Sequence, residues 1–104
     1  MEQIAFLMRL KSGNEREYRR RHDEIWPELR SALTRAGIRD YSIFLDERTL
    51  DLFAVLRLAP DNTRSELPSL PIMRRWWDFM ADLMEVDETN RPIERALTPM
   101  FHMD

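Results

Sequence analysis

The alternation of two hydrophobic periodicities along the chain constrains its fold more than any other feature. Apolar residues first form an uninterrupted run of strand length and then recur at steps of three and four, as on one face of a helix. Two strand-length runs joined by a polar turn follow, and then a second helical pattern. The resulting order, β-α-β-β-α-β, predicts a ferredoxin-like sandwich of the α+β class. We expect strands at residues 4–10, 38–45, 50–58 and 98–103, and helices carrying inward residues from Tyr18 to Ala36 and over residues 72–85.

Proline and glycine refine these boundaries. Pro27 lacks an N–H and its ring collides with the carbonyl of Asp23, so the first helix must kink or restart there. Gly37 is typical of the residue just beyond a helix end. Residues 60–71 contain three prolines and predict a broken stretch with a short helical turn. The polar connection at 86–97 has a length often found in lids.

A chain of 104 residues is the size of one domain, so residues 1–104 are expected to fold as a single unit. A formal charge of −3 gives no global attraction to nucleic acid or anionic lipid. The basic run Arg19–Arg21 predicts either a solvated helix face or a small anion-binding patch. The chain begins without a basic leader and has no apolar run of membrane-spanning length, and a cytoplasmic location is therefore expected.

Both faces of the expected sheet are apolar. In the third strand Leu52 and Leu56 point one way, while Phe53 and Val55 point the other. Helices cover only one face of a ferredoxin-like sheet, and an uncovered apolar patch of this size rarely stays in contact with water. We therefore expect a homodimer formed sheet against sheet.

Few residues are available for chemistry. With two glycines the chain has no phosphate-binding loop, and without cysteine it has no thiolate metal site. His22 and His102 lack the spacing of metal ligands, and no serine lies in a nucleophile elbow. This inventory favours acid–base chemistry by the protein alone, with no metal and no cofactor.

Three groups of residues are candidates for a site, and each also has a simpler explanation as packing. Tyr18 and His22 are four residues apart and share one helix face, next to the expected break at Pro27. Trp76 and Trp77 are adjacent indoles that suit the apolar face of a sugar, although one can serve as core. Tyr41 alternates with inward strand residues, which is typical of a packed ring with its hydroxyl at the rim.

Several separated motifs together resemble the L-rhamnose mutarotase family over essentially the full length of the chain. The resemblance includes the final Met100-Phe101-His102-Met103-Asp104. The other matching segments are Tyr18-x-Arg20-Arg21-His22 running into Ile25-Trp26-Pro27-Glu28-Leu29, Gly37-x-x-x-Tyr41-Ser42-Ile43-Phe44-Leu45-Asp46, and Arg75-Trp76-Trp77 with Met80 and Met84.

The resemblance implies a dimeric α/β barrel that interconverts the α and β anomers of L-rhamnose. It implies that His22 is the catalytic proton donor and that Tyr18, Tyr41, Trp76 and Trp77 contact the substrate. Anomer exchange by ring opening requires no metal, redox centre or covalent intermediate, in agreement with the residue inventory.

Some alternatives stay open at this point. The base that partners His22 could be Asp23, a tyrosine, water or His102. L-fucose, L-lyxose or L-mannose could also be substrates, because one pocket methyl contact contributes only a few kcal/mol. The rival functions are a cofactor-free monooxygenase-like or haem-binding protein of the same fold, and a non-catalytic sugar-binding module.

Overall fold

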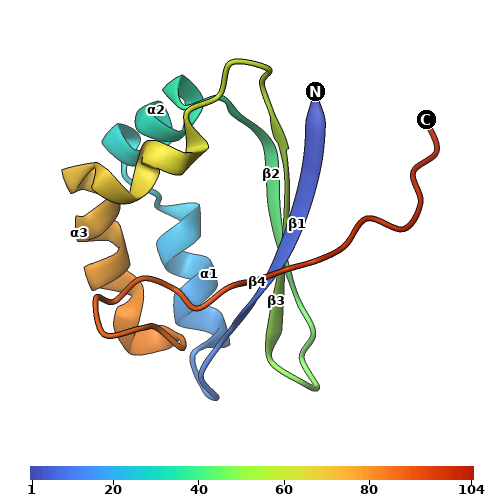
Figure 1. The fold of residues 1–104 in the computed structure, drawn as a ribbon. Helices are drawn as coiled ribbons and strands as arrows, with labels where there is room; N and C mark the ends of the chain where they lie inside the picture. Colours follow the sequence, from blue (N-terminus) through green and yellow to red (C-terminus); the bar gives the residue numbers. More distant parts are fainter.

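A computed structural model describes all residues from 1 to 104 and contains one antiparallel four-stranded sheet in the order β2-β3-β1-β4. The three α-helices all lie on one side of it, and the other side is not covered by a helix (Figure 1). None of these helices is long and apolar enough to cross a membrane. The strands are β1 (Glu2–Arg9), β2 (Ile38–Leu45), β3 (Asp51–Leu58) and β4 (Arg95–Ala96), the α-helices are α1 (Glu15–Asp23), α2 (Pro27–Arg35) and α3 (Pro71–Met80), and the 3-10 helices are η1 (Arg64–Ser69) and η2 (Ala81–Leu83).

The chain breaks between α1 and α2, as Pro27 predicts. Trp26 has an extended backbone (φ −61°, ψ 131°), and Pro27 is the first residue of α2. Proline is well suited to that position because the first N–H groups of a helix have no partner within it. The break follows α1 directly, so His22 stands in the last turn of its helix.

Gly37 ends α2 and brings the chain into β2. Its φ is +93°, a left-handed conformation that glycine adopts with little strain. A Cβ atom on Gly37 would lie 2.9 Å from the Cα atom of Asn62, so a side chain has no room there. The sequence prediction of a helix-ending glycine is confirmed, and the close approach explains why this position is so restricted.

Strand β3 divides the molecule into two sides. Leu52, Ala54 and Leu56 face the helices and are at most 2% exposed, whereas Phe53 is 40% exposed on the opposite side. Phe53 pairs with Leu7 of β1 and with Phe44 of β2, so these residues share what we call the open side of the sheet. The expected apolar character of both sheet faces is confirmed.

The prediction of a last strand at 98–103 is wrong. The strand consists of Arg95–Ala96, which pairs with β1, and the amide of Leu97 makes one further bond to the carbonyl of Ala5. Beyond it the chain leaves the sheet edge on the side away from the helices (Figure 1). The alternating apolar residues that suggested a strand find no surface within this chain, as the exposed Met100 (89%), Phe101 (85%) and Met103 (78%) show.

The second expected helix is also shorter than residues 72–85. It tightens after Met80 into η2, and Met84 is fully extended (φ −147°, ψ 168°). The reason is competition from β1. The amide of Lys11 binds the carbonyl of Leu83, and the amide of Glu85 binds the carbonyl of Arg9. Backbone groups used in these bonds cannot continue a helix.

Candidate active site

His22 and Tyr18 lie together on the inward face of α1, one turn apart. Their ring centroids are 4.4 Å apart, and Tyr18 is 7% exposed. His22 Nδ1 lies 3.1 Å from the carbonyl oxygen of Tyr18. A carbonyl oxygen can only accept a hydrogen bond, so Nδ1 carries the hydrogen, and in the neutral ring Nε2 has a free lone pair. The spacing read from the sequence is therefore a real contact that fixes the tautomer.

The surroundings of His22 favour its neutral form. Burial lowers the pKa of His22 below its usual 6.5, partly opposed by the hydrogen bond to Tyr18 and by the charge of Asp23. No protein group bonds Nε2. The arrangement thus leaves one nitrogen able to take up or release a proton, which is the basic requirement of an acid–base catalyst.

An aromatic cluster from α3 and the α1–α2 break faces this imidazole. The edge-on contact of His22 with Trp76 has a centroid distance of 5.4 Å, and Trp26 meets Trp76 edge-on at 5.1 Å. Phe79 contacts both Trp26 and Trp76. Edge-to-face contacts of this kind fix the relative orientation of rings as well as burying apolar area. Trp76 is therefore held in a defined position beside His22.

Tyr41 lies at a β-bulge in β2. The register between β2 and β3 shifts between Arg39 and Ser42, and Asp40 has a positive φ of 48°. Bulges re-aim a side chain and are common beside active sites. Although 41% of the Tyr41 surface is exposed, desolvation by its neighbours and the charge of Glu94 raise its pKa to about 12, against a smaller opposing effect of Arg64.

The pKa values of both tyrosines are raised. Burial raises the pKa of Tyr18 well above its ordinary value, and a further increase comes from Tyr41. Both phenols therefore keep their protons at neutral pH, where each can donate and accept hydrogen bonds. Ring contacts join Tyr18, His22 and Trp76, whereas no ring contact or hydrogen bond joins Tyr41 to any of them.

Trp77 has different partners from Trp76. The guanidinium groups of Arg74 and Arg91 lie 5.7 Å and 5.5 Å from its ring centroid. No ring contact joins Trp77 to His22 or Tyr18. Arg91 belongs to the 86–97 connection, which is also tied to α3 by a 3.1 Å bond from Asn90 to Asp78. Trp77 thus lies where that connection meets α3.

Neither Asp23 nor His102 makes a hydrogen bond to the imidazole. The Asp23 carboxylate is 70% exposed and is 3.9 Å from Arg19 on the outer face of α1. His102 is in the exposed C-terminal segment, where its Nε2 lies 2.8 Å from Asp104. That segment runs on the other side of the sheet from α1 (Figure 1).

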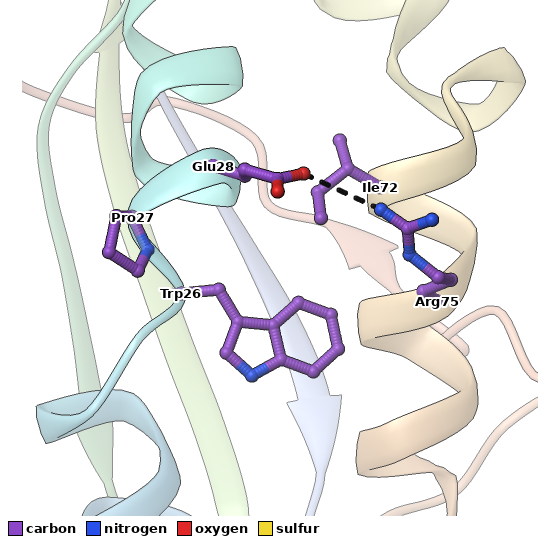
Figure 2. A pocket seen from close by; sticks show the side chains of 5 residues that line it. All are labelled: Trp26, Pro27, Glu28, Ile72 and Arg75. Atoms are coloured by element: carbon purple, nitrogen blue, oxygen red, sulfur yellow. Dashed lines mark ion pairs between the residues drawn. The ribbon is translucent and has the colours of Figure 1, made fainter.

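A shallow groove of about 390 Å³ opens on the outside of the helical layer, between the start of α2 and α3. Glu28 and Arg75 face each other across it at 3.5 Å, and Trp26 lies below them (Figure 2). Its lining includes neither His22 nor Tyr18. The groove therefore borders the aromatic cluster through Trp26 without containing the candidate catalytic group.

Metal-binding side chains do not gather anywhere in the fold as a group of three or more His, Cys, Asp or Glu residues. The basic run on α1 is largely used in ion pairs. Arg20 and Arg21 both bind Glu17, and Arg21 also binds Asp82. Of the two explanations for this run, the structure favours a helix face with internal pairs over a patch left free for an anion.

Sequence reasoning missed Trp26, Phe79 and Asp82 as neighbours of the site. Trp26 and Phe79 carried a usable signal, since each is a large aromatic residue at helical spacing from an identified residue. Asp82 carried none, because its partner Arg21 is on another helix and their contact depends on how α1 and α3 pack.

The fold and the site together define a small α+β protein that presents a neutral imidazole to an aromatic wall. The family model described as L-rhamnose mutarotase matches residues 3–103. L-rhamnose mutarotases of Burkholderia orbicola and Brucella anthropi are 58% and 50% identical, covering 100% and 98% of this chain and 100% and 96% of their own. The crystal structure of an L-rhamnose mutarotase from Formosa agariphila superimposes with a TM-score of 0.93 at 41% identity, covering 100% of both chains.

The chain belongs to the L-rhamnose mutarotase family, and the resemblance noted in the sequence is confirmed. A protein from Mycobacterium tuberculosis has the same general fold, with a TM-score of 0.56 at 13% identity over 99% of this chain and 100% of its own. At that identity the likeness concerns the fold alone.

Proposed function

We propose that the protein interconverts the α and β anomers of L-rhamnose, acting as an isomerase. The relatives described above are named L-rhamnose mutarotases, and each of them matches this chain over nearly its full length. The observation that carries the proposal is the tautomer of His22. Its Nδ1–H is committed to the Tyr18 carbonyl, and Nε2 is left as the single atom through which a proton can pass. None of the relatives described above bears a monooxygenase or haem-protein name.

The reaction needs two balanced proton movements. The ring oxygen gains a proton while the anomeric hydroxyl loses one, and the bond between C1 and the ring oxygen breaks to give the open aldehyde. Rotation about the C1–C2 bond exposes the other face of the carbonyl. Reclosure then reverses both proton movements and forms the second anomer. No electrons are gained or lost overall, and no group is transferred to the protein.

His22 is the proton donor to the ring oxygen in this proposal. Its lowered pKa makes the protonated ring a stronger acid, and the neutral ring is ready to take the proton back on reclosure. Nε2 makes this exchange while Nδ1 stays on the Tyr18 carbonyl. General acid–base catalysis of this kind contributes about 10²- to 10⁴-fold to a rate.

The remaining site residues bind the sugar. Tyr18 and Tyr41 keep their protons at neutral pH and hold sugar hydroxyls. Trp76 and Trp77 line the apolar face of the ring and its methyl group. For the anomeric proton we propose water as the acceptor. The Asp23 carboxylate lies 3.9 Å from Arg19 on the outer face of α1, and the C-terminal segment that includes His102 runs on the other side of the sheet (Figure 1).

A homodimer formed sheet against sheet, making a dimeric α/β barrel, is part of the proposal. It is supported by the open side of the sheet, where Phe44 is 65% and Phe53 is 40% exposed. Two aromatic residues side by side on neighbouring strands are costly to leave in water, since burying each stabilises by about 1.5–3 kcal/mol. A cytoplasmic location stays a prediction from the sequence.

The test is to measure anomeric proton exchange by saturation-transfer NMR, with and without the protein, for L-rhamnose, L-fucose, L-lyxose and L-mannose. We expect transfer between the two anomers of L-rhamnose to accelerate in proportion to protein concentration. Chemical-shift changes on adding L-rhamnose with no acceleration would instead identify a sugar-binding module. Oxygen uptake with a quinol, or a Soret shift with haem, would favour the other rivals.

A further inference from the structure

Three consecutive arginines on α1 have different surroundings. Arg19 is 86% exposed and its only ion pair is with Asp23, on the same helix. Arg20 is 52% exposed, and both its partners, Glu17 and Glu24, are also on α1. Arg21 is only 12% exposed, and it pairs both with Glu17 on α1 and with Asp82 in η2, just beyond α3. A guanidinium is rarely buried to this extent without a structural or functional role.

The Arg21 guanidinium joins two helices through all three of its nitrogens. Nε lies 2.8 Å from Glu17 on α1. Nη1 lies 2.6 Å from the carbonyl oxygen of Phe79 and 2.9 Å from Asp82, and Nη2 lies 3.3 Å from the second Asp82 oxygen. The Phe79 carbonyl belongs to the last turn of α3, where carbonyl groups lack partners within the helix. Arg21 therefore caps the C-terminus of α3 and forms a bidentate ion pair with Asp82 just beyond it.

The same guanidinium also fixes the aromatic cluster. Its carbon lies 4.5 Å from the centroid of the Phe79 ring. Phe79 in turn contacts Trp76, and Trp76 meets His22 edge-on. His22 is the next residue after Arg21 along α1. The Arg21 side chain is thus connected to both residues of the His22–Trp76 contact. It is linked to His22 through the backbone of α1 and to Trp76 through Phe79 of α3.

We propose that Arg21, held by Asp82, is a positioning residue that keeps Trp76 and His22 in the relative orientation needed for proton transfer to the bound sugar. This inference rests on the proposed function of His22. A lysine cannot replace Arg21, because an ammonium lacks the planar fork that reaches a carboxylate and a carbonyl while stacking on a ring. Both carboxylate oxygens of Asp82 accept hydrogen bonds from Arg21, so we expect a change at Asp82 to act through Arg21.

The experiment compares Arg21→Lys and Asp82→Ala with a matched control, Arg20→Met. The control removes a charge from the same helix and two ion pairs, but those pairs do not leave α1. For L-rhamnose exchange we expect both test variants to lose about 10- to 100-fold in kcat with a smaller change in KM, as misplaced catalytic groups do. Arg20→Met should retain the wild-type kcat.

A second readout does not depend on activity. The chain has two histidines, and His102 in the exposed segment serves as an internal reference. Because the Tyr18 and Trp76 rings lie beside His22, we expect their ring currents to displace the His22 Hε1 resonance. In both test variants the His22 resonance should move towards that of His102. Should Arg21→Lys fail to fold, Asp82→Ala still provides the test, because it changes an exposed residue.

The inference is overturned if the test variants keep the wild-type kcat and His22 resonance while losing only thermal stability, since Arg21 would then serve stability alone. If the wild-type protein does not accelerate exchange, the proposed function fails. The resonance then still shows whether Arg21 sets the His22–Trp76 contact.

Discussion

The two sides of the sheet use the same strands in opposite ways. On the helix side, Leu52, Ala54 and Leu56 of β3 are buried, and His22 and Tyr18 are packed above the sheet and bonded to each other. On the open side, Phe53 of the same strand and Phe44 of β2 remain exposed. On the helix side, this chain supplies ring contacts to the imidazole from Tyr18 and Trp76. On the open side, Leu7 is buried, whereas Phe44 and Phe53 are left exposed by this chain.

The largest effect is expected on the helix side, from His22→Gln. Glutamine keeps much of the volume and the polarity but cannot exchange a proton near neutral pH. Catalysed L-rhamnose exchange should fall by about 10²- to 10⁴-fold, the usual contribution of a general acid–base group. Saturation-transfer NMR gives the rate, and light scattering should show an unchanged mass, because the open side is untouched. If His22→Gln also dissociated the oligomer, the helix side and the open side of the sheet would not be independent.

The open side is tested by a double variant, Phe44→Glu with Phe53→Glu. We expect the proposed dimer to weaken by about 100-fold or more, since each lost aromatic burial costs about 1.5–3 kcal/mol and carboxylates would face each other. Sedimentation equilibrium gives the association constant, with Ser31→Glu on the exposed face of α2 as the matched control. A wild-type protein that sediments as a monomer at micromolar concentration would contradict the dimer.

The junction between the helical layer and the sheet can be tested with two glycines. Gly37→Ala should lower the free energy of unfolding for two reasons. Alanine in a left-handed conformation costs about 1–2 kcal/mol, and the clash of its Cβ atom with Asn62 costs about 1–3 kcal/mol more. Gly13 has a similar φ of +87° but open space around it. Gly13→Ala should therefore lower the free energy of unfolding only by the backbone cost of about 1–2 kcal/mol. Urea unfolding curves measure both. Equal losses would show that Gly37 is restricted by its backbone alone.

A smaller effect concerns the tyrosines. Tyr18 and Tyr41 are the only two in the chain, so phenolate absorbance at 295 nm reports on the site. Raised pKa values predict little phenolate at pH 10, where a free tyrosine is half ionised. In Glu94→Gln the pKa of Tyr41 should fall from about 12, because a neighbouring negative charge has been removed. An unchanged titration would place Glu94 outside the surroundings of Tyr41.

Local rules predicted the parts of the fold that local sequence controls. Pro27 ended one helix and began another, and Gly37 ended the second, for steric reasons that do not depend on the rest of the molecule. The same local rules gave a wrong prediction for residues 98–103. Their apolar alternation is that of a strand, but whether it pairs depends on a neighbouring edge, and the chain leaves β1 after Leu97.

The candidate site divides in the same way. The pair Tyr18–His22 was visible because a spacing of four on a helix guarantees proximity. Neither the contact of Trp76 with His22 nor the bridge from Arg21 to Asp82 was visible, because the first joins α1 to α3 and the second joins α1 to η2. Their geometry is set when the two helices pack on one sheet. The bulge at Asp40, which re-aims Tyr41, is likewise decided by pairing with β3.

The central claim is that the imidazole of His22 delivers the proton, and the pH dependence of kcat/KM for L-rhamnose exchange tests it most directly. Burial lowers the pKa of His22, so the proton-donating form is complete only below an inflection that lies under 6.5. The enzyme-catalysed kcat/KM should therefore be level at low pH and fall about tenfold per pH unit above that inflection. The inflection should coincide with the His22 titration followed by NMR and be absent in His22→Gln. A kcat/KM that instead falls on acidification, or keeps its inflection without the imidazole, would contradict the account.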